Sequence, residues 1–121
     1  MGCHADSSWV IALIDSADKH HEEAKAQFEG LFQQPALSSI VLTELLIQLQ
    51  GKTETTERVK QIFSQVIDLG PDIATKCAEI KVKNRVSINE AIVIASALSQ
   101  DATLLTFNKR IEKIMACHRI D

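Results

Sequence analysis

Hydrophobic residues recur at helical spacing along most of this chain, with short apolar runs between the helical patterns. Residues 6–15, and those that follow Ser87, are apolar almost all round, which predicts two buried helices. Asp6 or Ser7 can cap the first of these helices. Other periodic patterns predict helices at 19–32, 40–52, 55–65, 71–84 and 109–114.

Three residues mark where predicted helices begin or end. Asp18 can cap the helix predicted at 19–32. Gly51 ends the helix predicted at 40–52. Pro71 is well placed at the first position of a helix, because that position needs no backbone N–H.

Short apolar or β-branched runs predict strands between the helices, at 2–5, 66–70, 102–108 and 116–120. Strands that alternate with helices indicate an α/β fold with a mainly parallel sheet. In such sheets, functional sites form at the carboxyl ends of the strands, where the next helices begin. Asp6 and Asn108 follow predicted strands, and Glu90 begins a helix that can point to the same place.

The composition is that of a soluble globular protein, with 45% hydrophobic and 24% charged residues. A chain of 121 residues is long enough for one hydrophobic core, so residues 1–121 are expected to form a single domain. No apolar run approaches the roughly 20 residues of a membrane-spanning helix, and we expect no membrane contact. Three cysteines without paired spacing, and no secretion signal, predict a reducing, cytoplasmic location.

Charge is uneven along the chain, although the net charge is only -3. This negative total argues against a broad basic surface for nucleic acid. Two basic clusters nevertheless flank the predicted buried helix that follows Ser87. Their members are Lys81, Lys83, Arg85, Lys109 and Arg110. Such clusters are more often solvated helix faces than binding sites, so they support a phosphate-binding rim only beside other evidence.

Four polar residues stand in otherwise apolar surroundings, and each has a simple structural explanation. Asp6 can cap a helix, and Asn108 can occupy a turn. Glu90 lies three residues after Ser87, which is the spacing of a capping box. Glu44 lies on the more polar side of its predicted helix and can be exposed. Taken singly, these residues predict no chemistry.

Taken in order, the segments around these residues resemble the PIN domain family, a compact nuclease fold that includes the VapC-type toxins of toxin–antitoxin pairs. The segments that carry the resemblance are "ADSSWVIALID", "SSIVLTELLIQL", "SINEAIVIASAL" and "ATLLTFNKRI". The similarity spans residues 5 to 115. It implies a three-layer α/β/α sandwich with a central, mainly parallel sheet of four or five strands.

The resemblance implies a metal-dependent endoribonuclease, which hydrolyses RNA phosphodiester bonds through an acidic cleft. Asp6, Glu44 and Glu90 would bind Mg²⁺ or Mn²⁺, because carboxylates that meet in a cleft repel one another and are stabilised by such a cation. Asn108 would complete the catalytic set as a weaker ligand or as a group that orients water.

The resemblance also implies supporting residues and partners. Ser7 and Thr106 would hold the catalytic set through hydrogen bonds, and the two basic clusters would contact RNA phosphates. A VapC-type toxin would pair with a small antitoxin, a segment of which covers the cleft, and would form a homodimer.

Two departures from the family pattern keep an alternative function open. The third acidic position, usually Asp, is Glu90 here, and the fourth, often Asp, is the neutral Asn108. Both changes alter the oxygen atoms available to metal ions. The alternative is a catalytically weak or inactive PIN-like module that binds RNA or a protein partner.

Other chemistries have less support in the sequence. No zinc-type spacing connects the pairs Cys3–His4, His20–His21 and Cys117–His118. There is no Gly-x-Ser-x-Gly segment, and no cysteine has an evident activating partner. A zinc or copper site and a nucleophilic mechanism are therefore not expected.

Overall fold

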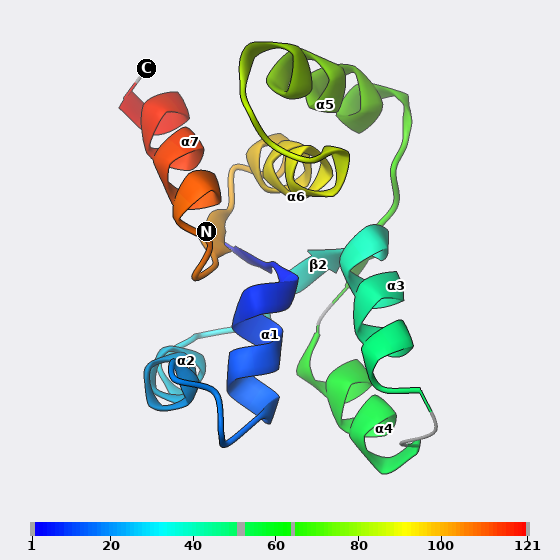
Figure 1. The fold of residues 1–121 in the computed structure, drawn as a ribbon, viewed down its shortest axis with the longest axis vertical. Coiled ribbons are helices and arrows are strands. Elements are labelled where there is room, and N and C mark those ends of the chain that lie inside the picture. The colour runs from blue at the N-terminus through cyan, green and yellow to red at the C-terminus, as the bar shows by residue number, and fades with distance from the viewer. Residues whose placement is uncertain (1, 51–52, 64, 121) are drawn as a thin grey trace.

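The structure is a computed structural model that describes residues 2–50, 53–63 and 65–120. Helices dominate these residues, and four short strands lie between them (Figure 1). The strands are β1 (Cys3–Ala5), β2 (Ala36–Ser38), β3 (Val66–Ile67) and β4 (Thr103–Leu105). The helices are α1 (Ser7–Ile14), α2 (His21–Glu29), α3 (Ser39–Gln48), α4 (Thr53–Ile62), α5 (Pro71–Lys83), α6 (Ile88–Ser99) and α7 (Lys109–Ile120).

The four strands run parallel to one another, in the order β3-β2-β1-β4. His4 of the central strand β1 is level with Ala36 of β2 and Leu104 of β4. Parallel neighbours need a crossover connection, and helices supply each crossover here. This arrangement confirms the predicted α/β fold with a parallel sheet of four strands.

Helices cover the sheet on both sides (Figure 1). The helices α1 to α4 lie on one side, where Ala5, Leu37 and Leu105 of the strands join a core that includes Trp9 and Val41. The helices α5 to α7 lie on the other side, around a second core. The buried residues of this second core are Cys77, Ile80, Val86, Ala91, Ile92, Ile94, Ala95, Ala97, Ile111 and Met115. Two helical layers around a parallel sheet form the three-layer α/β/α sandwich that the resemblance implied.

The start of α1 holds Asp6 at the carboxyl end of β1. Asp6 has extended backbone, and its Oδ1 accepts a hydrogen bond from Trp9 N at 3.1 Å, so Asp6 caps the helix. A cap of this kind stabilises a helix by about 1 kcal/mol. Trp9 is fully buried, and its Nε1 donates to Gln27 Oε1 at 2.7 Å. The cap and the buried indole together fix the backbone that carries Asp6.

The second helix is shorter than its pattern predicted. The prediction covered 19–32, whereas α2 ends at Glu29. Asp18 is not its cap, because His20 occupies that position, and Asp18 instead accepts a hydrogen bond from His20 N at 2.8 Å. Phe32, the last residue of the predicted helix, lies beyond α2 and is fully exposed.

The last predicted strand, at 116–120, is wrong, because these residues continue α7. Ile111 and Met115 precede this segment and are buried in the second core one helical turn apart, so they anchor the helix that runs on through 116–120. The strand β2 was not predicted. It has only three residues, too few for a period of two to be visible in the sequence.

Other helices agree more closely with the predictions. The helix predicted at 40–52 spans Ser39–Gln48, and its predicted end at Gly51 lies outside the described residues. The helix α5 begins at Pro71, as the missing N–H of proline predicted. In the part of the chain that the structure describes, none of the helices has the length and apolar character needed to cross a membrane.

Candidate active site

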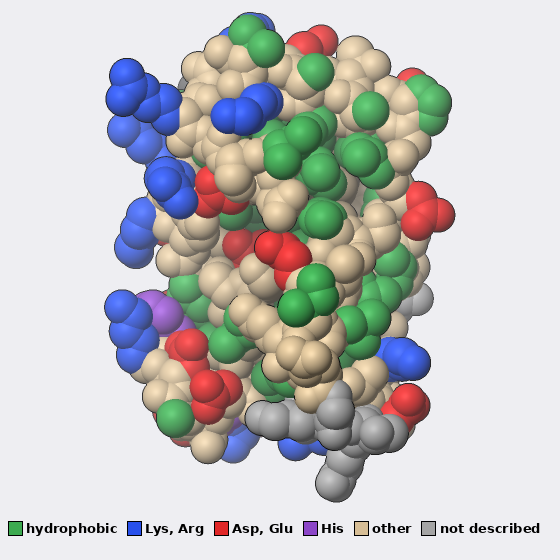
Figure 2. All heavy atoms as spheres, turned by 45° about the vertical axis from the view of Figure 1, so that its right-hand side comes forward, with side chains coloured by type: hydrophobic (Ala, Val, Ile, Leu, Met, Phe, Trp, Pro, Cys, Tyr) green, Lys and Arg blue, Asp and Glu red, His purple; other side chains and the backbone are tan. Residues whose placement is uncertain are grey.

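A cleft of about 300 Å³ lies where β1 and β4 end and α6 begins. All four residues of the predicted catalytic set line it: Asp6, Glu44, Glu90 and Asn108. Figure 2 shows acidic side chains near the middle of one face of the molecule, with Lys and Arg side chains along its left edge. The fold therefore gathers polar residues from four separate segments of the chain into one cleft.

Asp6 is buried, with 4% of its surface exposed. Its Oδ1 accepts hydrogen bonds from Ser8 Oγ at 2.7 Å and from Trp9 N at 3.1 Å, and its Oδ2 accepts one from Thr106 Oγ1 at 2.6 Å. Burial raises the pKa of the Asp6 carboxyl above its ordinary value, and these hydrogen bonds oppose the rise in part. Asp6 is thus a firmly positioned carboxylate, and Thr106 makes the supporting hydrogen bond expected of it.

Ser8 makes the hydrogen bonds that the sequence had assigned to its neighbour Ser7. The Ser8 hydroxyl donates to Asp6 and also accepts a hydrogen bond from Phe107 N at 3.0 Å, so it ties the start of α1 to the loop after β4. Ser7 lines the cleft, but among the described residues its hydroxyl makes no such bond. Both serines directly follow Asp6, and only the folded position of Phe107 distinguishes them.

Replacing Ser8 with Ala is expected to lower the free energy of unfolding by about 1 to 3 kcal/mol, because the Phe107 N–H loses its acceptor in a partly buried place. Ser7→Ala is the matched control and should change the same quantity by less than about 0.5 kcal/mol. Urea unfolding of both variants measures the difference. Equal stabilities would show that the Ser8 hydroxyl does not hold the loop.

Glu90 combines a capping role and a position in the cleft, and it uses a different oxygen for each. Its Oε1 accepts a hydrogen bond from Ser87 N at 2.9 Å, while Ser87 Oγ accepts one from Glu90 N at 3.0 Å, which completes a capping box. Its Oε2 accepts hydrogen bonds from Asn108 Nδ2 at 2.6 Å and from Arg110 Nη2 at 3.1 Å. Burial raises the pKa of Glu90, but the bonds from Ser87 and Asn108 and the charge of Arg110 outweigh it, so the pKa lies below its ordinary value.

Asn108 acts in this arrangement as a donor to Glu90 and not as an oxygen ligand. Its Oδ1 accepts hydrogen bonds from Arg110 N at 3.0 Å and Ile111 N at 3.3 Å, the first free N–H groups of α7. Because these two donors require an acceptor, the amide must turn its Nδ2 toward the cleft. The predicted role of Asn108 as a weak metal ligand would need this cap to open.

Glu44 reaches the cleft from α3 and has few polar contacts. Its Oε2 lies 3.5 Å from Asn89 Nδ2, and Asn89 also lines the cleft. Asn89 was not among the site residues that the sequence predicted. Its position directly before Glu90, in the first turn of a helix that points at the cleft, is the signal that could have identified it.

The donor chemistry of the cleft suits a hard divalent cation, because Asp6, Glu44 and Glu90 all offer carboxylate oxygens. Among the residues that the structure describes, however, no group of three or more His, Cys, Asp or Glu residues is arranged to hold a metal ion. In the observed arrangement, both oxygens of Glu90 already accept hydrogen bonds. Glu90 would bind a cation most easily after one of these donors has moved away.

One of the five basic residues predicted at the rim, Arg110, lines the cleft. Lys109 lies beside it in sequence, but its side chain is 91% exposed and pairs with Glu112 at 3.6 Å. The other three are exposed residues at the end of α5 and after it, and do not line the cleft: Lys81, Lys83 and Arg85.

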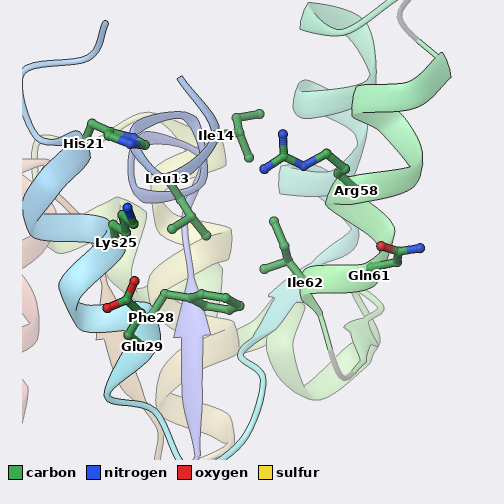
Figure 3. A pocket seen from close by; sticks show the side chains of 9 residues that line it. All are labelled: Leu13, Ile14, His21, Lys25, Phe28, Glu29, Arg58, Gln61 and Ile62. Atoms are coloured by element: carbon green, nitrogen blue, oxygen red, sulfur yellow. The ribbon is translucent and has the colours of Figure 1, made fainter. Parts of the chain in front are cut away.

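A larger hollow, of about 550 Å³, lies between α1, α2 and α4 (Figure 3). Leu13, Ile14, Phe28 and Ile62 give it an apolar lining, and Glu29 is the acid among its lining residues. It shares no lining residue with the acidic cleft. The sequence did not predict this hollow, and its side chains do not form a catalytic group.

The protein is therefore of the α/β class: a three-layer α/β/α sandwich with a parallel sheet. An acidic cleft lies at the carboxyl edge of that sheet. The family model described as PIN domain matches residues 5–116. The chain therefore belongs to the PIN domain family, as its four motifs predicted.

Solved structures of several bacterial proteins share this fold. A toxin–antitoxin complex from Klebsiella pneumoniae is 24% identical, with a TM-score of 0.75, and the match covers 90% of this chain and 88% of that one. VapC20 of Mycobacterium tuberculosis, described as a Sarcin-Ricin loop cleaving toxin, is 19% identical, with a TM-score of 0.75 and coverage of 93% and 95%. FitAcB of Neisseria gonorrhoeae is 18% identical, with a TM-score of 0.76 and coverage of 90% and 89%. No curated protein gives a match. At these identities, the likeness establishes the shared fold.

Proposed function

We propose that this protein is a metal-dependent endoribonuclease that hydrolyses RNA phosphodiester bonds, with Asp6, Glu44 and Glu90 as ligands of Mg²⁺ or Mn²⁺. The observation that carries the proposal is the position of these three carboxylates in one cleft of a PIN domain. The description of the structural neighbour VapC20 as a cleaving toxin supports the same activity.

In the proposed reaction, hydrogen bonds within the protein position the carboxylates that would bind the cation. A bound cation would supply a Lewis acid that activates water and offsets charge on the phosphodiester. Ser8, Trp9 and Thr106 hold both oxygens of Asp6, which reduces the cost of placing that carboxylate for ligation. Among the residues that the structure describes, Glu44 has only a long contact with Asn89, so its carboxylate is the most free of the three to move toward a ligand.

We propose further that the protein is the cytoplasmic toxin of a toxin–antitoxin pair, that a small antitoxin binds it, and that it forms a homodimer. The structural neighbour described as a toxin–antitoxin complex supports the antitoxin partner. The large apolar side chains with at least half of their surface exposed, which are candidates for such protein contacts, are Phe32, Ile47, Leu69, Val82 and Ile88.

Cleavage of single-stranded RNA in the presence of Mn²⁺ tests the proposed activity. Glu44→Gln and Glu90→Gln are each expected to slow cleavage by at least about tenfold, because each removes a negative oxygen from the ligand set. Glu79→Gln is the matched control, since Glu79 is a solvent-exposed acid of α5 that pairs with Lys76 at 3.8 Å. This control should cleave like the unmodified protein.

Cleavage that persists at the full rate in both cleft variants would contradict the assigned residues. A folded protein that cleaves no RNA with either Mg²⁺ or Mn²⁺ would favour the second candidate function, a PIN-like module that binds RNA or protein without cutting. The hydrogen bonds that engage both oxygens of Glu90 are the specific observation on the side of this second candidate.

A further inference from the structure

Arg110 is a cation that the protein itself places in the acidic cleft. Its Nη2 lies 3.1 Å from Glu90 Oε2, and the residue lines the cleft together with Asp6 and Glu44. The described residues that line the cleft include three acids and one basic residue, Arg110. One guanidinium therefore offsets part of the negative charge that a divalent cation would otherwise neutralise.

The two partners of this ion pair differ strongly in exposure. The side chain of Glu90 is 13% exposed, whereas that of Arg110 is 68% exposed. Glu90 is also fixed at its other oxygen by Ser87 N and at the same oxygen by Asn108 Nδ2. The carboxylate is thus the stationary member of the pair, and the guanidinium is free to leave it for solvent at small cost.

The backbone of Arg110 stays at the cleft even if its side chain moves. Its N–H donates to Asn108 Oδ1 at 3.0 Å in the first turn of α7. A guanidinium that leaves Glu90 therefore remains within one side-chain length of the cleft. Its planar fork of donors suits the oxygens of a phosphodiester, with which it can form paired hydrogen bonds.

We propose that Arg110 is an exchangeable counter-cation of the cleft: it neutralises Glu90 in the metal-free protein, and it transfers to an RNA phosphate when a divalent cation takes Glu90. This inference rests on the proposed metal-dependent nuclease function and adds to it the residue that couples metal binding to RNA binding. Arg110 then has opposite effects on the two ligands. It competes with the cation for Glu90, and it attracts the RNA backbone.

Two binding measurements on the full chain test this coupling, without any assay of cleavage. Calorimetric titration of metal-free protein with Mn²⁺ should show that Arg110→Gln binds the ion about three- to tenfold more tightly than the unmodified protein, because a competing exposed ion pair is gone. Fluorescence anisotropy with a short single-stranded RNA should show weaker RNA binding by Arg110→Gln. The salt dependence of that binding should also become less steep by about 0.7 in a double-logarithmic plot, as expected for one lost phosphate contact.

Lys109→Gln is the matched control, because it removes the same charge one residue away from a side chain that pairs with Glu112 and does not line the cleft. Its affinity for Mn²⁺ should stay within about twofold of the unmodified value. Arg110→Lys keeps the charge and should retain most of the competition with Mn²⁺.

The outcomes separate this inference from the proposed function. If the unmodified protein binds Mn²⁺ and cleaves RNA, but Arg110→Gln binds Mn²⁺ with unchanged affinity, the counter-cation role is overturned and the nuclease stands. If Arg110→Gln loses affinity for both Mn²⁺ and RNA, Arg110 has a merely structural role, and the counter-cation role is again overturned. If no variant binds Mn²⁺ and none cleaves RNA, the proposed function and the inference fail together.

Discussion

Asp6→Asn is expected to slow RNA cleavage by at least about 100-fold, equivalent to about 2.7 kcal/mol of activation free energy, and to leave the protein equally stable or more stable. The loss follows from the proposed role of Asp6 as a metal ligand, because a neutral amide is a much weaker ligand than a carboxylate. The stability follows from its surroundings. Burial raises the pKa of Asp6, so the folded protein holds its charged form at a cost that Asn does not carry.

Asn also keeps the structural part of the role. Its side-chain oxygen can still accept the hydrogen bond from Trp9 N that caps α1, and Asn is as good a cap as Asp. Thermal unfolding at pH 7 and the initial rate of RNA cleavage with Mn²⁺ are the two measurements. Growth arrest on expression of the unmodified protein, absent with Asp6→Asn, would extend the result to the proposed toxin role.

Two results would contradict the expectation for Asp6. A variant that cleaves RNA at the normal rate would remove Asp6 from the metal site. A variant that unfolds at a markedly lower temperature would show that its loss of activity reports misfolding. Thr106→Val would then separate the two, since it keeps the Asp6 carboxylate but removes the hydroxyl that donates to Asp6 Oδ2 and accepts from Asn108 N.

Acidification from pH 6.5 to pH 4 is expected to destabilise the protein by roughly 3 kcal/mol through His4 alone. His4 lies in the central strand β1, and none of its surface is exposed. Burial lowers its pKa from the ordinary value of 6.5 to about 4, although the hydrogen bond between Nδ1 and Gln100 Oε1 opposes the change. Among the described residues, Nε2 of His4 is a buried atom without a hydrogen-bond partner, so a proton added there would have no acceptor.

The sign follows from where the proton binds. Between pH 6.5 and pH 4, the unfolded chain protonates His4 while the folded protein does not, so falling pH favours unfolding. Above pH 6.5, neither state carries the proton and the contribution of His4 is constant. Below pH 4, both states carry it and the loss is complete.

Denaturant unfolding at a series of pH values measures this slope, and two substitutions isolate it. His4→Gln and His4→Leu both remove the titrating group, but only Gln keeps a donor for Gln100 Oε1. Both variants should therefore lose the same part of the slope between pH 4 and pH 6.5, whatever their stability at pH 7. A slope that survives in both would place the acid sensitivity elsewhere in the protein.

The sequence predicted the elements with strong and long periodicity and failed where neighbours decide the structure. The buried helix after Ser87 appears as α6, because a continuous apolar pattern of this length has no other stable form. The strand β2 has three residues, and its pairing with β1 and β3 determines its structure more than its own pattern does. The segment 116–120 looks like a strand in isolation, but it continues α7, which Ile111 and Met115 anchor in the second core before the segment begins.

The same limit applies to the candidate site. Asp6, Glu44, Glu90 and Asn108 could be placed in one cleft because their segments, taken in order, resemble the PIN domain family, whereas each residue by itself predicts no chemistry. That Ser8, and not Ser7, makes the supporting hydrogen bonds could not be predicted, because it depends on where the fold brings the N–H of Phe107. The orientation of the Asn108 amide was equally hidden, since the backbone of α7 fixes it.

The hydrogen bond from Thr106 to Asp6 joins residues that are 100 positions apart. Of the four described strands, β1 is made first, yet it lies in the sheet beside β4, which is made last. A domain emerges from the ribosome with its N-terminus first, so β1 must wait for one of its two neighbours until Thr103–Leu105 have appeared. A nascent chain that ends before these residues therefore carries no assembled cleft, and whatever the cleft does begins only after they have been made.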